Sequence, residues 1–298
     1  MKSKKSNRTL HLMMLPSVIA LMIFSYVPMA GIIIAFQKFN PGYGLFGASP
    51  WIGLDNFRYV FSLPSIWQVV YNTLILSIAK IVIGTILAII TALLLNECRY
   101  RLFKRSVQTL IYFPYFISWI ILAGVISDIL SPTSGVVNQL ITAMGGNPIY
   151  FLGDNDYFRG TLIITDVWRD FGYNSVVYLA AITGIDLSLY EAAAIDGAGR
   201  WKQTIHVTLP GMSVIIILMI ILNMGNLLNA GFDQVFNMYS PGVYESGDII
   251  DTMVFRLGIQ QGQLSPSTAV GLLKSGVSLF LISLSYYIAA KKFDYKIF

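Results

Sequence analysis

The sequence predicts an all-α protein that crosses a membrane six times. Its 298 residues are 55% hydrophobic and 12% charged. The hydrophobic fraction exceeds what the core of a soluble protein needs, and the charged fraction is too small for a soluble protein's surface. Apolar runs recur along the chain, and at about 1.5 Å per residue each is long enough to cross about 30 Å of hydrocarbon. Basic residues gather in every second connecting segment. We therefore expect a polytopic membrane protein with one transmembrane domain.

The expected spans follow the apolar runs: about 12–36, 71–95, 107–130, 161–185, 212–232 and 270–290. The first run is too long for a signal peptide and indicates an uncleaved membrane anchor. The segments 131–160 and 233–269 are rich in Gly, Pro and polar residues, which predicts exposed loops. No composition shift marks a separate soluble domain.

The distribution of basic residues predicts the orientation. Six spans place both termini on one side, and that side receives Lys2, Lys4, Lys5, Arg8, Arg99, Arg101, Lys104, Arg105, Arg200, Lys202, Lys291, Lys292 and Lys296. The opposite loops receive only Lys38, Arg58, Arg159 and Arg256. By the positive-inside rule both termini lie in the cytoplasm, and the net charge of +5 is a topology signal and not a nucleic-acid footprint.

The sequence contains no recognisable catalytic or metal-binding motif. Its single cysteine, Cys98, excludes an internal disulfide and a cysteine-built metal site. A Walker-type Gly-Lys-Ser loop and a Ser-His-Asp set are both missing. We expect no catalytic residue, no metal and no cofactor in this chain, which would therefore not be an enzyme.

The polar run Ser188–Pro210 separates two of the predicted spans and should project into the cytoplasm. Ser188 and Glu191 have the spacing of a capping box, which predicts a short helix that ends at Gly197 and Gly199. A second helical segment should follow from Arg200 to Val207, with Pro210 in the first turn of the next span. Small residues let a partner approach the backbone of this elbow closely.

Three parts of this run, Glu191-Ala192-Ala193, Asp196-Gly197-Ala198 and Val207-Thr208-Leu209-Pro210, resemble the EAA loop of binding-protein-dependent ABC importer permeases. The flanking spans resemble the oligosaccharide branch of that family. Thr204 and Val207 depart from it, since the family usually has an aromatic residue and isoleucine there. An ordinary capped cytoplasmic loop is the alternative interpretation.

The resemblance implies several partners and one contact surface. It implies a second homologous permease, an extracytoplasmic solute-binding protein and a dimeric ABC ATPase that holds ATP and Mg²⁺, all at a bacterial cell membrane, and no nucleic acid. The coupling loop 186–210 would contact the ATPase through Glu191, Ala192, Ala193, Asp196, Gly197, Ala198 and Trp201.

Charged residues inside the predicted spans indicate where lipid is excluded. They are Lys80, Asp128, Asp166, Arg169, Asp170 and Lys274, and all fall in the outer half of their spans. A water-filled vestibule would explain them. Pairwise bridges are the other explanation, for example Asp166 with Arg169, or Lys80 with an acid of 161–185.

Polar residues recur at helical spacing on the two spans that flank the elbow. They predict a path for a hydroxyl-rich solute, because amides both donate and accept hydrogen bonds and aromatic rings stack on sugars. The path residues are Tyr173, Asn174, Asn223, Asn226, Asn229 and Asp233. The alternatives are amides that join helices, an ABC permease for a non-sugar solute, and a secondary transporter driven by an ion gradient.

Overall fold

The computed structural model describes residues 3–45 and 47–292. The described residues form helices and one isolated bridge between Gln37 and Trp51, with no strand, which confirms the all-α class. Lys2 and Lys296, which we assigned to the cytoplasmic side, lie outside the described residues. The chain divides into two compact units, Met1–Ile66 with Val254–Leu273 and Trp67–Met253 with Lys274–Phe298, and each is described by itself.

The first unit contains the predicted N-terminal span. α1 (Ser3–Leu21), η1 (Met22–Tyr26), α2 (Val27–Met29) and η2 (Ala30–Phe36) follow one another directly, and His11–Phe36 is apolar enough to cross a membrane. After η3 (Pro41–Tyr43), Asn56 on α3 (Asp55–Ser62) donates from Nδ2 to the carbonyl oxygens of Ala35 and Gln37 at 2.8 and 3.0 Å. This bond pair holds α3 against the end of η2. η7 (Arg256–Gln260) and the first turns of α16 (Leu264–Lys292) complete the unit.

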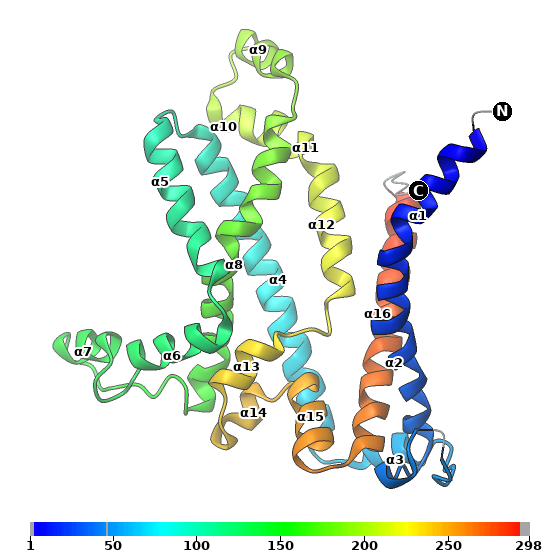
Figure 1. Ribbon diagram of the computed structural model, residues 1–298. Coiled ribbons are helices and arrows are strands. Elements are labelled where there is room, and N and C mark those ends of the chain that lie inside the picture. Colours follow the sequence, from blue (N-terminus) through cyan, green and yellow to red (C-terminus); the bar gives the residue numbers. More distant parts are fainter. Residues whose placement is uncertain (1–2, 46, 293–298) are drawn as a thin grey trace. The chain divides into compact units, whose positions relative to one another are not determined.

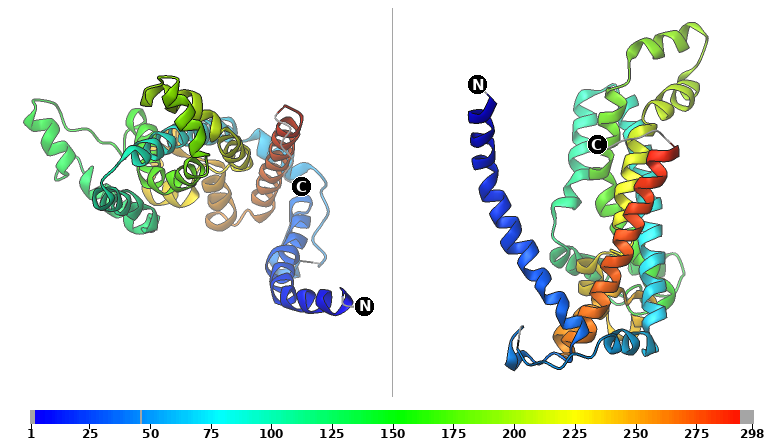
Figure 2. Two further views of the ribbon diagram at one scale, coloured as in Figure 1. Left: turned by 90° about the horizontal axis from the view of Figure 1, so that it is seen from above. Right: turned by 90° about the vertical axis from the view of Figure 1, so that its right-hand side faces the viewer.

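The second unit is built on the long helices α4 (Ile66–Glu97) and α8 (Asn155–Thr183), with α5 (Arg101–Tyr112) and α12 (Ser213–Gly225) beside them (Figure 1). α9 (Leu187–Ile195), α10 (Arg200–Gln203), η5 (Thr204–Thr208) and α11 (Leu209–Gly211) form one end. α13 (Phe232–Met238), η6 (Pro241–Val243), α14 (Tyr244–Gly247) and α15 (Ile250–Phe255) form the other. α6 (Trp119–Ile129) and α7 (Val136–Ala143) project sideways in both Figure 1 and the left view of Figure 2.

The segment 107–130, which we predicted as one span, is instead two helices. α5 and the short η4 (Phe113–Phe116) are bent by 105° from α6. Pro114 lacks an N–H and its ring crowds the preceding turn, so the helix cannot continue regularly. Ile117 is extended, and the side chain of Ser118 then caps α6.

The predicted span 212–232 is also interrupted. α12 has 13 residues and ends at Gly225, and Gly231 adopts a left-handed φ of 91° before α13 starts. Asn and Gly have low helix propensity, and Asn226 lies at the C-cap. α12 is long enough to span only together with residues 200–211, from which it is bent by 56°.

The predicted spans 71–95 and 270–290 lie within helices that extend beyond them, and the predicted span 161–185 ends two residues beyond α8. α4 and α16 each contain a stretch that is long and apolar enough to span, and α8 is unbroken to Thr183 but needs α9 to reach the same hydropathy because of its charges. The count of six crossings stays a prediction. The segment 233–269 is not an exposed loop as predicted: it carries α13 to α15, and Gln234 and Thr252 are fully buried.

Two apolar clusters hold the second unit together, one toward each end. Near α13, the cluster joins α4, α6, α8 and α13 through residues that include Leu76, Leu122 and Leu162. Near α9, Ala88 and Ala92 of α4 leave room for Tyr178 of α8, which is 1% exposed. Gly172 lets α8 approach the backbone of α5 closely, because a Cβ at this position would lie 2.1 Å from the carbonyl oxygen of Ile111.

Candidate functional site

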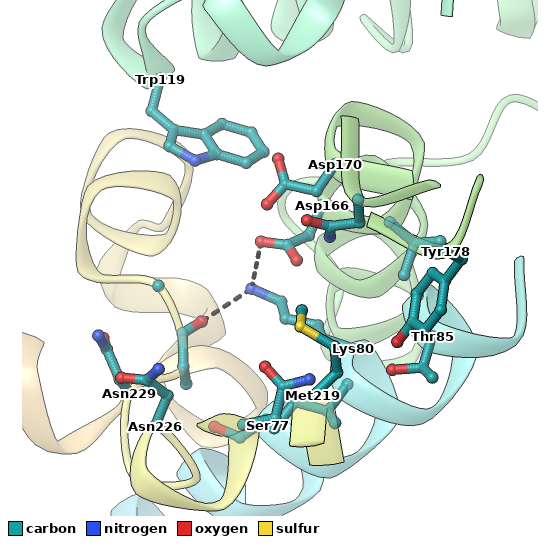
Figure 3. Close-up of a pocket in the computed structure, with 17 residues that line it drawn as sticks. Ser77, Lys80, Thr85, Trp119, Asp166, Asp170, Tyr178, Met219, Asn226 and Asn229 are labelled. Carbon is teal, nitrogen blue, oxygen red and sulfur yellow. Dashed lines mark hydrogen bonds and ion pairs between the residues drawn. The ribbon is translucent and has the colours of Figure 1, made fainter. Parts of the chain in front are cut away.

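A polar cavity of about 290 Å³ lies in the second unit. Its walls come from α4, α8, α12 and the non-helical residues that follow α12. α4 contributes Ser77, Lys80, Gly84 and Thr85, which recur on one helix face. The indole of Trp119, at the start of α6, closes one side of the cavity (Figure 3). The cavity therefore borders both helix interruptions, through Trp119 just after the first and through residues 226–231 of the second.

Four of the predicted path residues line this cavity: Asn174, Asn223, Asn226 and Asn229. Asn226 and Asn229 are exposed, and the other two are half-buried. Among the described residues, none of the four side-chain amides makes a hydrogen bond with the protein. Their donors and acceptors are thus available to whatever enters the cavity.

Tyr173 and Asp233 do not line the cavity, so this cavity does not support their place on the predicted path. The Tyr173 ring stacks on Tyr115 with centroids 3.9 Å apart and planes inclined by 4°, which occupies one of its faces. Asp233 is exposed on the first turn of α13. We placed Asp233 by continuing the helical period of Asn223 and Asn226, but the helix ends at Gly225.

Five of the six charged residues in the predicted spans are ion-paired in the part of the chain that the structure describes, and Asp128 has no ion-pair partner there. Lys80 Nζ lies 3.0 Å from Asp166 Oδ1, which is the expected pairing of Lys80 with an acid of the fourth predicted span. Arg169 Nη1 pairs with Asp170 Oδ1 at 3.1 Å and not with Asp166, because the guanidinium points toward the interruption between α5 and α6. Lys80, Asp166 and Asp170 line the cavity, whereas Arg169 lies behind the wall.

Lys274 lies away from the cavity and pairs with Asp251 of α15 at 2.5 Å. We had assigned Asp251 to an exposed loop. The remaining cavity residues that we did not predict are scattered over α4, α6, α8, α12 and the non-helical residues after α12, and include Ser77, Thr85 and Met219. For α4 a signal was present, since Ser77, Lys80 and Gly84 interrupt one face of an otherwise apolar helix.

The elbow between α8 and α12 begins with a capped helix. The N-cap is Asp186 and not Ser188, because the Asp186 carboxylate accepts a hydrogen bond from the Ser188 backbone N–H at 2.9 Å. This bond, followed by the bond to the Ser188 side chain, holds the pKa of Asp186 below its ordinary value. The predicted helix is present but starts before Ser188, at Leu187.

α9 ends in a left-handed turn at Gly197, where φ is 76°. The Ala198 N–H donates to the Ala193 carbonyl at 2.8 Å and the Gly197 N–H donates to the Ala194 carbonyl at 3.1 Å, which is the hydrogen-bond pattern of a Schellman motif. The helix therefore ends at Gly197 as predicted, because the glycine adopts the left-handed conformation that closes the last turn.

The elbow presents apolar side chains to solvent, and one side-chain contact joins it to the helical bundle while another joins two parts of the elbow. Ile195 is 87% and Trp201 76% exposed, and Glu191 on α9 is also exposed. Arg200 Nη1 pairs with Glu97 Oε2, at the end of α4, at 3.0 Å. Tyr190 and Thr208 share a hydrogen bond of 3.0 Å between their hydroxyl groups. The elbow thus offers a partner a preformed apolar surface.

Comparison with known proteins supports the family that the elbow predicted. Residues 84–297 match the family described as binding-protein-dependent transport system inner membrane component. The chain is 43% identical to the polygalacturonan/rhamnogalacturonan transport system permease protein YteP of Bacillus subtilis (strain 168), over 95% of this chain and 88% of the relative. It is 40% identical to protein LplB of the same organism, over 99% of this chain and 92% of the relative.

The fold is also similar to that of solved structures. A chain of a bacterial ABC transporter involved in the import of the acidic polysaccharide alginate matches with a TM-score of 0.90 and 35% identity, over 98% of both chains. A chain of the bacterial alginate ABC transporter in complex with alginate pentasaccharide-bound periplasmic protein matches with a TM-score of 0.88 and 34% identity, over 97% of this chain and 96% of that one. The chain therefore belongs to the family of binding-protein-dependent transport system inner membrane components, as a permease subunit of an ABC importer and not an enzyme.

Proposed function

We propose that this permease carries oligosaccharides into the cytoplasm through its amide-lined cavity. The observation that carries the proposal is the set of four unpartnered amides on the cavity wall, Asn174, Asn223, Asn226 and Asn229. Each amide offers two donor hydrogens and a carbonyl acceptor, which matches the mixed donor and acceptor character of sugar hydroxyls. The Trp119 indole adds a flat apolar face on which a pyranose ring can pack.

The size of the cavity supports a passage shared between two subunits. A volume of about 290 Å³ is at the lower end of the about 300–1,000 Å³ typical of small-molecule sites, and an oligosaccharide needs more room. We therefore infer that this chain supplies one wall and that a second, homologous permease supplies the opposite wall.

Acidic oligosaccharides are the proposed substrate class. YteP is named for the transport of polygalacturonan and rhamnogalacturonan and the solved transporter for the import of alginate, all of which are acidic glycans. Both cations next to the cavity, Lys80 and Arg169, are already ion-paired, so this wall offers neutral hydrogen-bonding groups and not a free positive charge. Selection of the acidic groups then falls mainly to the solute-binding protein and the second permease.

ATP hydrolysis is proposed to occur on a separate ATPase dimer that holds ATP and Mg²⁺. The exposed Ile195, Trp201 and Glu191 of the elbow support docking of such a subunit at α9. Closure of the dimer would bring this elbow toward that of the second permease. α8 and α12 would carry the motion to the cavity and switch its opening from the inner to the outer side.

The proposed location is a bacterial cell membrane with both termini in the cytoplasm. The Arg200–Glu97 pair supports it, because it places the elbow at the same end of the second unit as the basic segment Arg99–Arg105. Cytoplasmic loops carry an excess of Lys and Arg. An extracytoplasmic solute-binding protein would then approach from the α13 end.

The test is uptake of a radiolabelled oligogalacturonate by the complete importer in proteoliposomes that contain ATP. In the Asn226→Leu variant we expect KM to rise about 2–10-fold, since one hydrogen bond between neutral groups contributes about 0.5–1.5 kcal/mol. ATP hydrolysis stimulated by the loaded binding protein should persist, because the elbow is unchanged.

Asn237→Leu is the matched control. Asn237 is an exposed asparagine of α13 that donates to its own helix, at the Asp233 carbonyl, and it does not line the cavity. Unchanged uptake kinetics in Asn226→Leu, or an equal effect of Asn237→Leu, would remove the amide wall from the path. Failure of the unaltered importer to take up any oligosaccharide would overturn the substrate class.

A further inference from the structure

Part of the cavity wall is a stretch of the predicted span 212–232 that is not helical. It runs from Asn226 at the end of α12 to Gly231 at the start of α13, and it includes the cavity residues Asn229 and Ala230. The last carbonyl oxygens of a helix and those of irregular chain have no intrahelical partners. In a membrane such groups persist only where protein or water satisfies them.

Lys80 of α4 supplies such a partner to this stretch. Its ammonium group donates to the Ala230 carbonyl at 2.8 Å and to Gln234 Oε1, and it pairs with Asp166 Oδ1 at 3.0 Å (Figure 3). Three donors therefore meet three acceptors. The Lys80 side chain is 7% exposed, so its charge is satisfied almost entirely by protein.

Gln234 extends the same network to α8. This side chain is fully buried at the start of α13, and its Nε2 donates to the Leu162 carbonyl and to Thr165 Oγ1, both at 2.8 Å. Lys80 and Gln234 together connect α4 and α8 to the α13 end of the non-helical stretch. We call Lys80, Asp166 and Gln234 the clamp.

Gly231 shows how closely the clamp fits the chain. A Cβ at this position would lie 3.2 Å from Lys80 Nζ and 3.7 Å from Asp166 Oδ1. Its φ of 91° is also one that residues with a Cβ rarely adopt. The glycine therefore lets the backbone approach the ammonium group.

The interruption after α5 is supported in the same way. Arg169 Nη2 donates to the Tyr115 carbonyl at 3.0 Å and to the Ile117 carbonyl at 3.4 Å, while Nη1 pairs with Asp170 at 3.1 Å. The guanidinium carbon lies 5.0 Å from the ring centroid of Trp119. A paired cation thus binds the freed carbonyl oxygens at each interruption.

We propose that Lys80 is a positioning residue that holds the stretch Asn226–Gly231 in the cavity wall, and that it does not bind the acidic groups of the substrate. The inference rests on the proposed function for the role of the wall. The supporting contacts are internal to the chain and do not depend on which solute passes.

The first measurement reports on the stretch without transport. Cys98→Ser removes the only cysteine of the chain, and Ala230→Cys, at a position that is 1% exposed, then reports exposure of the stretch to a membrane-impermeant maleimide in the complete importer. With Lys80→Met we expect labelling at residue 230 to rise roughly tenfold, which corresponds to about 1.4 kcal/mol of local stability. Ala88→Cys, at a fully buried position of α4, should stay protected.

Two further variants keep the test decisive if Lys80→Met does not fold. Gly231→Ala displaces the clamp without changing any charge and should reproduce the increased labelling. Lys80→Arg retains a cation with several donors and should restore protection in large part. Unchanged labelling in both Lys80→Met and Gly231→Ala would overturn the proposal.

The second measurement separates positioning from ligand binding. Uptake of an oligogalacturonate is compared with uptake of its carboxyl-reduced counterpart of the same length. A positioning residue predicts that Lys80→Met raises KM for both solutes by the same factor. A rise for the acidic solute alone would make Lys80 a substrate-binding cation and would refute the inference. The labelling result stands even if neither solute is transported, so failure of the proposed function is recognised separately.

Discussion

Gly197 provides a direct test of how the elbow depends on its backbone geometry. Its φ of 76° is left-handed, and a residue with a Cβ pays about 1–2 kcal/mol there. A Cβ at Gly197 would meet nothing within 4 Å, so Gly197→Ala adds strain and no clash. A strain of this size lowers the equilibrium ratio of correctly bent to otherwise folded elbows by a factor of about 5–30.

The assay is ATP hydrolysis of the reconstituted importer, stimulated by the loaded solute-binding protein. Gly197→Ala should lower the stimulated rate and speed hydrogen exchange of the Ala198 amide, which donates to Ala193 in the turn. Gly199→Ala is the matched control, because Gly199 has an ordinary φ of −67° and an equally open surrounding. It should behave as the unaltered chain does.

Two further substitutions separate strain from bulk. Gly197→Asn should recover part of the lost rate, since asparagine tolerates the left-handed region better than alanine. Gly197→Trp adds bulk to strain and should abolish assembly or coupling while the spans remain folded. If Gly197→Ala and Gly199→Ala have equal effects, or if Gly197→Trp stimulates normally, the elbow does not act through this bend.

Two other predictions concern packing and capping. Gly172→Ala should lower the melting temperature of the purified importer, because a Cβ 2.1 Å from the Ile111 carbonyl oxygen forces α5 and α8 apart at a cost of about 1–3 kcal/mol. Gly160→Ala on the same helix meets nothing within 4 Å and should melt as the unaltered protein; equal melting of the two variants would contradict this. Asp186→Ala should speed hydrogen exchange in α9 at pH 7. The difference from the unaltered protein should shrink as the pH falls below about 4, because a carboxyl group whose pKa is lowered by folding stabilises the helix only while it is ionised. A difference that is absent at pH 7, or that grows on acidification, would refute the capping role.

The helices and the elbow could be predicted because their signals are local. An apolar run of sufficient length predicts a span, and the glycine at the end of α9 predicts the left-handed turn that the structure contains. The two interruptions were missed for different reasons. Pro114 indicates a helix break, but we gave more weight to the length of the apolar run around it. The end of α12 at Gly225 depends instead on tertiary contacts to the backbone carbonyl groups that lose their helical partners there.

The cavity was predicted in part for the same reason. Asn223 and Asn226 share a helix face, so their common position follows from the period of 3.6 residues. Asp233 does not share that face, because the helical period stops where α12 stops, so its place on the path stays a prediction. The Lys80 bond to the Ala230 carbonyl joins positions 150 residues apart, and nothing in the sequence indicates which backbone oxygen a buried lysine will meet.

The connection between elbow and cavity follows from where the structure is rigid and where it is not. α8 has 29 residues, about 43 Å at 1.5 Å per residue, and it carries cavity residues such as Asn174 before it reaches the Asp186 cap. Between these points Tyr178 and Ile182 pack on Ala88 and Ala92, and a packed contact of this kind transmits displacement without absorbing it. The interruptions at 113–118 and 226–231 lack a continuous series of α-helical hydrogen bonds. We therefore expect the backbone at these two segments to change conformation when α8 moves. Because the cations that hold them pair with acids of α8, we infer that displacement of the elbow changes the cavity chiefly at these two segments.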